Sequence, residues 1–244
     1  MQLQRFLILK PYAVIRELLQ GFIHLFYPHV CLHCASEQLH QVQIICSSCE
    51  SQLPFTNFAQ IKNNPVEKIF WGRTNIYQAN SILFFTKDSI VQSIIFELKY
   101  KQNKKAGYLL GRLIAIDLCN NPKYSEIDYL VPIPISIRKQ RTRGFNQSQI
   151  ICEAIVAGGF QKTIVQALKK TKSVFTQTHK NRTQRGELRS KMFAVNDNYI
   201  LKNKHLLIID DVLTTGATLE AASICLWDVA PASISILTAA YTYH

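Results

Sequence analysis

The stretch from His205 to Ala222 constrains the fold of this chain more than any other. It begins with the apolar run 206–209, which is typical of a parallel strand buried on both faces. Two carboxylates, Asp210 and Asp211, follow where that strand is expected to end, and a helix is predicted over residues 219–226. Strand, acidic pair, small-residue loop and helix in this order favour an α/β protein.

The loop between this strand and this helix suits an anion. Backbone N–H groups at a helix N-terminus have no intrahelical partner, and the helix dipole favours negative charge there. The acidic pair would repel a phosphate but accepts hydrogen bonds from sugar hydroxyls, and a bound Mg²⁺ would weaken the repulsion. The candidate phosphate-binding residues of the loop are Thr214, Thr215, Gly216, Ala217 and Thr218.

Two other interpretations fit parts of the stretch. The apolar run alone is typical of any buried strand followed by an ordinary turn. Apolar residues followed by two aspartates also fit a Walker B strand, which requires a phosphate loop of the form G-x-x-x-x-G-K-[ST]. None of the nine glycines is followed by lysine, which excludes the Walker interpretation.

Residues 206–218 closely resemble the phosphoribosyl pyrophosphate (PRPP) motif of type I phosphoribosyltransferases. In that family the acidic pair holds the ribose 2′ and 3′ hydroxyls, and the loop holds the 5′-phosphate. The resemblance implies a parallel sheet flanked by helices, with PRPP and Mg²⁺ as ligands. It makes Asp210 and Asp211 the candidate catalytic residues, at the carboxyl end of a strand where such sheets bind ligands.

Two C-x-x-C motifs, Cys31–Cys34 and Cys46–Cys49, are separated by eleven residues. Two thiolates on each of two tight turns resemble a structural zinc site. Disulfides are the alternative, but a cytoplasmic protein keeps its thiols reduced, and a redox motif needs only one pair. His29 or His33 could replace one cysteine. The predicted zinc ligands are Cys31, Cys34, Cys46 and Cys49.

The first 27 residues are apolar but interrupted by Lys10-Pro11 and by Arg16-Glu17. Neither an export signal nor a spanning helix fits this pattern, so the expected location is the cytoplasm. Apolar residues at helical spacing between positions 14 and 26 predict an amphipathic helix that packs on the protein. Association of this helix with a membrane surface is the less favoured alternative.

The charge of the chain is concentrated in one region. Hydrophobic residues make up 48% of the chain and charged residues 18%, as in an ordinary globular protein, but the formal net charge is +12. Between Arg138 and Lys191, thirteen Lys and Arg face two acids, which gives a net +11. This basicity indicates anionic partners such as phosphates, nucleic acid or an acidic membrane surface.

A second apolar strand is predicted over residues 129–135, and its prolines should end it because they cannot donate to a central ladder. A basic loop to Asn146 and a helix over 147–156 follow, so this turn is a second candidate anion site. In type I enzymes the corresponding turn contacts pyrophosphate. The candidate residues here are Pro134, Arg138 and Arg143.

The remaining segments are predicted more coarsely. Residues 76–86 fit a strand pair or an extended segment, and residues 233–239 fit a last strand. Helical periodicity between residues 90 and 118 is interrupted by the basic run 99–105, which is either a solvated turn or a nucleic-acid contact. The polar, basic stretch 168–193 is predicted to be a mobile surface loop, at the place where type I enzymes have a loop that closes over PRPP.

The order of the motifs narrows the resemblance. Val131–Pro134, Arg143–Gln147 and the loop after Asp211 follow the two cysteine motifs and the segment Leu98–Tyr100. Together they resemble the ComF family of competence-associated, phosphoribosyltransferase-like proteins. The resemblance implies a role in natural transformation, with single-stranded DNA and the DNA-uptake machinery as partners.

The expected domains are an N-terminal helix with a double zinc-knuckle module over residues 1–60 and a phosphoribosyltransferase-like domain over residues 61–244. Two functions follow. An active phosphoribosyltransferase would let a nitrogen nucleophile displace pyrophosphate from PRPP, with the carboxylates stabilising an oxocarbenium-like transition state. A binding protein would use the same site to sense PRPP or to hold the phosphates of single-stranded DNA. Positive charge serves both functions.

Overall fold

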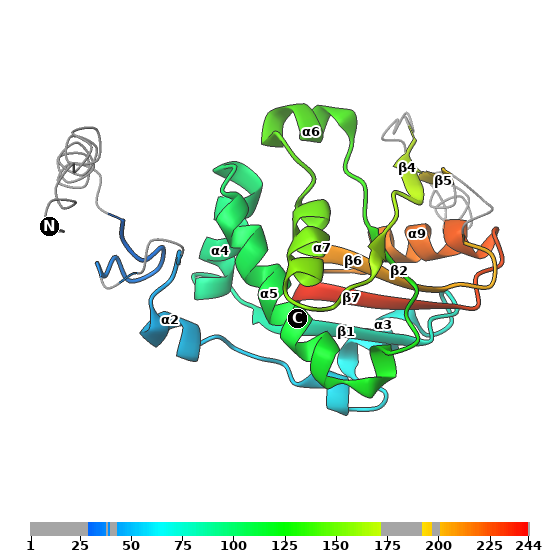
Figure 1. Cartoon of the computed structure of the whole chain (residues 1–244), viewed down its shortest axis with the longest axis horizontal. Helices are drawn as coiled ribbons and strands as arrows, with labels where there is room; N and C mark the ends of the chain where they lie inside the picture. The colour runs from blue at the N-terminus through cyan, green and yellow to red at the C-terminus, as the bar shows by residue number, and fades with distance from the viewer. Residues whose placement is uncertain (1–28, 38, 40–42, 172–191, 197–200, 244) are drawn as a thin grey trace, which may run out of the picture. The chain divides into compact units, whose positions relative to one another are not determined.

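The computed structural model describes residues 29–37, 39, 43–171, 192–196 and 201–243. The chain divides into two compact units, residues 1–52 and residues 53–244 (Figure 1). We expected the boundary near residue 60, but Thr56 and Phe58 belong to the second unit. The N–H of Thr56 donates to the carbonyl of Ile82 over 3.0 Å, and Phe58 is buried in the core. The expected N-terminal helix lies outside the described residues.

The first unit is small and built around its cysteines. Helix α2 (Ser47–Ser51) begins directly after Cys46. The buried apolar side chains of its described part are Cys31, Ile44, Ile45, Cys46 and Cys49. The described part of this unit therefore contains only a small hydrophobic core.

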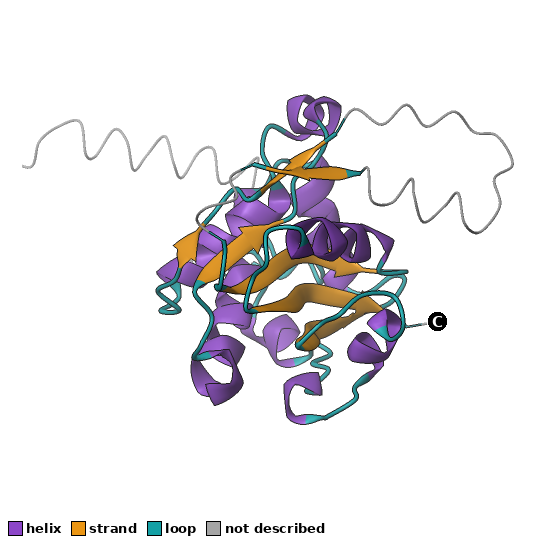
Figure 2. Ribbon diagram, turned by 90° about the vertical axis from the view of Figure 1, so that its right-hand side faces the viewer, coloured by secondary structure: helices purple, strands orange, loops and turns teal. Residues whose placement is uncertain are grey.

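The second unit is a parallel sheet with helices on both faces (Figure 2). The strand order is β1-β7-β6-β2-β3, and each neighbouring pair is parallel. The strands are β1 (Gln78–Phe85), β2 (Tyr129–Pro132), β3 (Thr163–Ile164), β6 (His205–Leu213) and β7 (Ser233–Thr242). The predicted α/β fold is confirmed, and the segment left open at residues 76–86 is the edge strand β1.

The apolar run of β6 alternates between two cores. Leu206 and Ile208 pack in one hydrophobic cluster with α3 (Pro65–Phe70) and α9 (Ala217–Trp227). Leu207 and Ile209 are also fully buried but lie outside that cluster. The opposite face carries the helices α4 (Ile90–Tyr100), α5 (Lys104–Asn120) and α7 (Gln147–Ala157). Burial on both faces explains why the run is continuous rather than alternating.

Two glycines allow α4, α5 and α7 to pack closely. A Cβ on Gly107 would lie 2.6 Å from Ile150 Cγ2 and 3.1 Å from Leu98 Cδ1. A Cβ on Gly111 would lie 2.4 Å from the Cβ of Ala154. We call Gly107 and Gly111 the glycine seam. It brings the backbone of α5 against α7, as small residues do at close helix crossings.

The basic turn after β2 contains a helix that we did not predict. Helix α6 (Ile137–Arg143) begins at Ser136, whose hydroxyl accepts from the N–H of Lys139 over 3.3 Å. It ends at Gly144, whose φ of 76° is the left-handed conformation that glycine adopts at helix ends. Serine before the helix and glycine after it were the signals in the sequence.

The expected surface loop 168–193 is described only at its ends. There β4 (Leu168–Lys170) and β5 (Phe193–Val195) pair as a two-stranded antiparallel sheet, and residues 172–191 lie outside the described residues. The short 3-10 helices are η1 (Phe58–Gln60) and η2 (Pro122–Tyr124). Within the described ranges, every helix is too short or too polar to cross a lipid bilayer.

Candidate functional site

A cavity of about 560 Å³ lies at the carboxyl ends of β2 and β6, where parallel sheets bind their ligands. Carboxylates, hydroxyls and cations meet in it. The carboxylates are Asp210 and Asp211; the hydroxyls include those of Ser148, Thr214 and Thr218; the cations are Lys99, Lys139, Arg143 and Lys170. The arrangement can hold an anion beside a group that donates hydrogen bonds.

The cavity brings together most of the residues predicted to form a ligand site. Its lining includes Asp210, Asp211, Thr214, Thr218, Pro134 and Arg143. Thr215, Gly216 and Ala217 lie in the same loop, at the start of α9, but do not line the cavity. Arg138 does not line it either: it is exposed on α6, and its neighbour Lys139 takes its place.

The acidic pair is held by two helices on the same face of the sheet. The hydroxyl of Ser148 in α7 donates to Asp210 Oδ1 over 2.9 Å, and the N–H of Asp211 donates to the same oxygen over 2.9 Å. The ammonium of Lys99 in α4 lies 2.9 Å from Asp211 Oδ1. Both aspartates are still part of β6, and Asp210 pairs in register with Thr238 of β7.

The first carboxylate of the pair has a raised pKa. Burial and the neighbouring charge of Asp211 raise the pKa of Asp210 to about 7, although the Asp211 N–H, Lys99 and Ser148 act in the opposite direction. Near neutral pH, Asp210 therefore exchanges between a neutral and a charged form, whereas its neighbour has an ammonium partner. A ligand that donates a hydrogen bond to Asp210 favours the charged form.

Sequence reasoning did not assign Lys99, Ser148, Lys139 or Lys170 to the site. Lys99 lay in a segment that carried the family resemblance, and Lys139 lay beside a predicted residue. Lys170 lies on β4, next to the part of the chain outside the described residues. None of these cations adjoins the acidic pair in sequence, so only the fold brings them together.

One arginine, Arg73, holds the loop before α9 in place. Arg73 donates from Nη1 to the carbonyl of Thr215 over 3.0 Å and from Nε to Glu220 Oε2 over 2.9 Å. Glu220 is buried in the first turn of α9. The Arg73–Glu220 ion pair thus fixes the loop to the segment between α3 and β1, which limits the movement of the backbone N–H groups that would meet a phosphate.

Gly216 is required at the start of this loop for two reasons. Its φ is +75°, and a Cβ would lie 2.7 Å from Ile69 Cγ2. We expect Gly216→Ala to lower the free energy of unfolding by about 2–4 kcal/mol, through left-handed strain plus overpacking. Gly72→Ala is the matched control, because Gly72 has a φ of +67° and no atom within 4 Å of a built Cβ.

The control should lose only about 1–2 kcal/mol, the cost of left-handed backbone alone. Urea unfolding of both variants gives the two values. Equal losses in Gly216→Ala and Gly72→Ala would show that the contact with Ile69 has no energetic weight.

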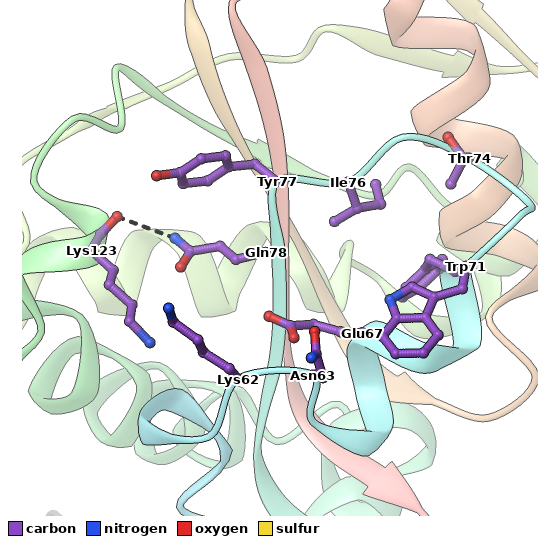
Figure 3. Close-up of a pocket in the computed structure, with 10 residues that line it drawn as sticks. Lys62, Asn63, Glu67, Trp71, Thr74, Ile76, Tyr77, Gln78 and Lys123 are labelled. Carbon is purple, nitrogen blue, oxygen red and sulfur yellow. Dashed lines mark hydrogen bonds between the residues drawn. The ribbon is translucent and has the colours of Figure 1, made fainter.

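A second hollow, of about 430 Å³, lies beside the start of β1 (Figure 3). Lys62 and Lys123 lie on one side of it and Trp71 on the other, and Lys123 Nζ already donates to the carbonyl of Ala59 over 2.9 Å. Its one carboxylate, Glu67, accepts from the backbone of Asn64 in a helix cap. This hollow lacks both the acidic pair and the hydroxyl loop, so the cavity at β6 is the candidate site.

The four predicted metal ligands come together in the first unit. The sulfur atoms of Cys31, Cys34, Cys46 and Cys49 all lie within 4.8 Å of one another, and those of Cys34 and Cys46 are 3.6 Å apart. A tetrahedral zinc site with Zn–S bonds of about 2.3 Å needs sulfurs about 3.8 Å apart. The four cysteines are therefore positioned to hold one metal ion. His29, the alternative ligand, instead contacts the carbonyl of Gln43 over 2.7 Å.

The protonation of the cysteines also fits a cation. Burial alone would raise the pKa of Cys31, but the backbone N–H groups of Cys34, His33 and Cys46 lower it to about 6. Burial and the neighbouring sulfurs raise the pKa of Cys49. Four thiolates cannot share this space unless a cation compensates their charge. The other cysteines of the described residues lie outside this cluster: Cys152 and Cys225 are buried, and Cys119 is exposed.

Comparison with known proteins indicates the class of protein to which this chain is similar. Residues 137–243 match the phosphoribosyl transferase domain. This match, together with the parallel sheet and the motif at the end of β6, shows a phosphoribosyltransferase-like protein.

The curated relatives point to a family. The chain is 34% identical to competence protein ComFC of Bacillus subtilis over 110 residues, which cover 45% of this chain and 42% of that protein. It is 26% identical to DNA utilization protein YhgH of Escherichia coli K12 over 128 residues, which cover 51% of this chain and 56% of that protein. The chain spans about half the length of the curated relatives it matches. These matches support a ComF-family, phosphoribosyltransferase-like protein.

Proposed function

We propose that this protein binds PRPP, with Mg²⁺ on its pyrophosphate, in the cavity at the end of β6. One observation carries the proposal: two adjacent carboxylates, held by Ser148 and Lys99, face a cavity that also contains cations. A phosphate alone would be repelled by the carboxylates. A ligand that has both vicinal hydroxyls and phosphates uses both sets of groups.

The parts of PRPP have separate partners in this proposal. The ribose hydroxyls donate to Asp210 and Asp211. The 5′-phosphate accepts from the N–H groups of loop 214–218 at the start of α9, where the helix dipole favours an anion. The pyrophosphate lies near Lys139 and Arg143, and Mg²⁺ neutralises part of its charge.

Isothermal titration calorimetry tests this assignment. At pH 8 with Mg²⁺ we expect one PRPP per chain and a dissociation constant in the micromolar range, as ordinary substrate sites show. Ribose 5-phosphate lacks the pyrophosphate and should bind more weakly. A wild-type protein that gives no heat with PRPP and Mg²⁺ would remove the ligand assignment.

We also propose that four cysteines of the first unit hold a structural zinc ion. Cys31, Cys34, Cys46 and Cys49 would fill all four positions of a tetrahedral site, so the metal would have no open position for catalysis. Its contribution would be to the folding of residues 1–52.

A second function, the handling of single-stranded DNA, is favoured by charge and by the relatives. The net +11 between Arg138 and Lys191 supplies cations for phosphates, and the names of two relatives refer to competence and DNA utilization. Phosphate contacts dominate such binding and make it salt-dependent.

We expect the affinity for an oligo-dT strand to fall steeply with salt. Each phosphate contact contributes about −0.7 to the slope of log K against log salt, so four contacts weaken binding roughly 50-fold between about 50 and 200 mM. Fluorescence anisotropy of an end-labelled strand measures the slope. If the strand does not bind at low salt, the DNA proposal is wrong, while PRPP binding is judged separately.

A further inference from the structure

Two exposed aromatic side chains lie at the mouth of the cavity. Phe96 and Tyr100 are one helical turn apart on α4, so they share the outer face of that helix. Phe96 is 49% exposed and Tyr100 is 65% exposed, and both line the cavity. Large aromatic rings usually bury most of their surface, so two exposed rings side by side need a reason.

These rings form a continuous surface. Their centroids are 5.1 Å apart, and the planes are tilted by 41°. The guanidinium of Arg143 lies 5.7 Å from the Tyr100 centroid, where its charge is attracted to the ring. Arg143 is itself held by the side-chain oxygen of Gln147 over 3.0 Å. Tyr100 is therefore supported from α6, and its ring can offer a face to a planar ligand.

Cations flank the aromatic pair on the turn between α4 and α5. Lys101 caps the end of α4 and is exposed, and Lys104 begins α5 with its ammonium 5.6 Å from the ring of Phe145. Exposed aromatic rings interleaved with cations are the arrangement on which single-stranded nucleic acids stack their bases and track their phosphates.

We propose that Phe96 and Tyr100 form a stacking site for a nucleobase of a single DNA strand at the mouth of the cavity. A strand fits better than a free base, because the rings are half open to solvent, whereas small-molecule sites enclose most of their ligand. A strand also adds phosphate contacts with Lys101 and Lys104. The proposal rests on the proposed DNA function and adds the place where a base is held.

The stacking site lies next to the proposed ribose site along the chain. Lys99 lies between Phe96 and Tyr100 in the sequence of α4, and its ammonium is 2.9 Å from Asp211 Oδ1. Its neighbour Tyr100 lies at the mouth of the cavity. A base on the rings would thus lie near the entrance through which PRPP passes. Strand binding and PRPP binding meet at one opening.

The test compares binding of oligo-dT to full-length variants by fluorescence anisotropy at low salt. Removing one stacked base costs roughly 5- to 100-fold in affinity. We expect such a loss in Tyr100→Leu and a larger one in the double variant with Phe96→Leu, and we expect Tyr100→Phe to bind like wild type. The matched control is Tyr77→Leu, since Tyr77 is 68% exposed and lies beside Lys62 and Lys123 in the other hollow.

A second readout reports geometry. An oligonucleotide with 5-iodouracil should, on irradiation, cross-link to a peptide that contains Phe96 or Tyr100, and mass spectrometry identifies the peptide. Free thymidine monophosphate at the same concentration is the competitor that reveals a site for isolated bases. Competition at stoichiometric levels would overturn the choice of a strand.

The outcomes separate the two proposals. Tight, salt-sensitive binding that is unchanged in Tyr100→Leu and Phe96→Leu overturns the stacking site and leaves the DNA function in place. Equal losses in Tyr77→Leu and Tyr100→Leu also overturn it. No binding of the strand by wild type removes both, whereas PRPP calorimetry on the wild-type protein reports the sugar site independently.

Discussion

Purified protein should contain about one zinc per chain, and removing it should unfold residues 1–52 while the second unit stays folded. The reason is the size of the two cores. The described part of the first unit buries mainly the cysteines and two isoleucines, whereas the second unit has cores on both faces of its sheet. Zinc binding by four cysteines contributes about 10–16 kcal/mol to folding in small domains, far more than such a core supplies.

The variant that tests this is Cys34→Ala, with Cys119→Ala as its control. Both cysteines are exposed, but only Cys34 belongs to the cluster. Metal analysis and limited proteolysis should show loss of zinc and cleavage within residues 1–52 for Cys34→Ala, and neither for Cys119→Ala. A metal-free preparation that resists cleavage in this range would contradict the zinc proposal.

Replacing the acidic pair should abolish measurable PRPP binding. Hydrogen bonds to a charged group contribute about 1.5–3 kcal/mol each, so Asp210→Ala with Asp211→Ala should lose about 3–6 kcal/mol, or a factor of roughly 10² to 10⁴. Calorimetry at pH 8 measures the loss. The charge-matched control is Asp228→Ala, because Asp228 is an exposed carboxylate after α9 that does not line the cavity.

The fold should survive the single substitution Asp210→Ala. Because the pKa of Asp210 is raised to about 7 in the folded protein, protonation of this side chain favours the folded state. That stability is present below the unfolded pKa near 4 and is lost as the pH rises through 7. At pH 8 the charged side chain is already unfavourable to the fold, so alanine removes a cost. An Asp210→Ala variant that unfolds at pH 8 would contradict this account of the site.

The same pKa predicts the pH dependence of binding. Ribose hydroxyls donate to the charged carboxylate, so wild-type affinity should fall as the pH drops below about 7, at most tenfold per unit. The variant Asp210→Ala should lose this part of the dependence. The pH dependence that remains in the Asp210→Ala variant comes from protonation of the ligand's phosphates.

The sequence was most informative where chemistry and structure coincide locally. The run 206–209, the acidic pair and Gly216 lie within eleven residues, so their order alone predicted a strand, a loop and a helix start. The two C-x-x-C motifs likewise carry their geometry in their spacing. Such features need no knowledge of the rest of the fold.

The sequence did not predict contacts between segments that lie far apart in the chain. The edge strand β1 pairs with β7, which lies more than 140 residues later, and nothing near residue 80 indicates this partner. The sequence pointed to Arg138 rather than Lys139 as a phosphate-binding residue for a related reason. We predicted a loop where α6 lies, and one residue on a helix turns the side chain by about 100°, which places Lys139 and not Arg138 at the cavity.

The glycine seam has a consequence for the size of the ligand. Lys99 on α4 and Ser148 on α7 each contact one carboxylate, and a Cβ on Gly107 of α5 would press on Leu98 of α4 and Ile150 of α7. We therefore expect a side chain at Gly107 to change the spacing between Lys99 and Ser148. Alanine at Gly107 or Gly111 would push α5 away from α7, so a design for a bulkier sugar phosphate would begin at these two positions, which do not line the cavity.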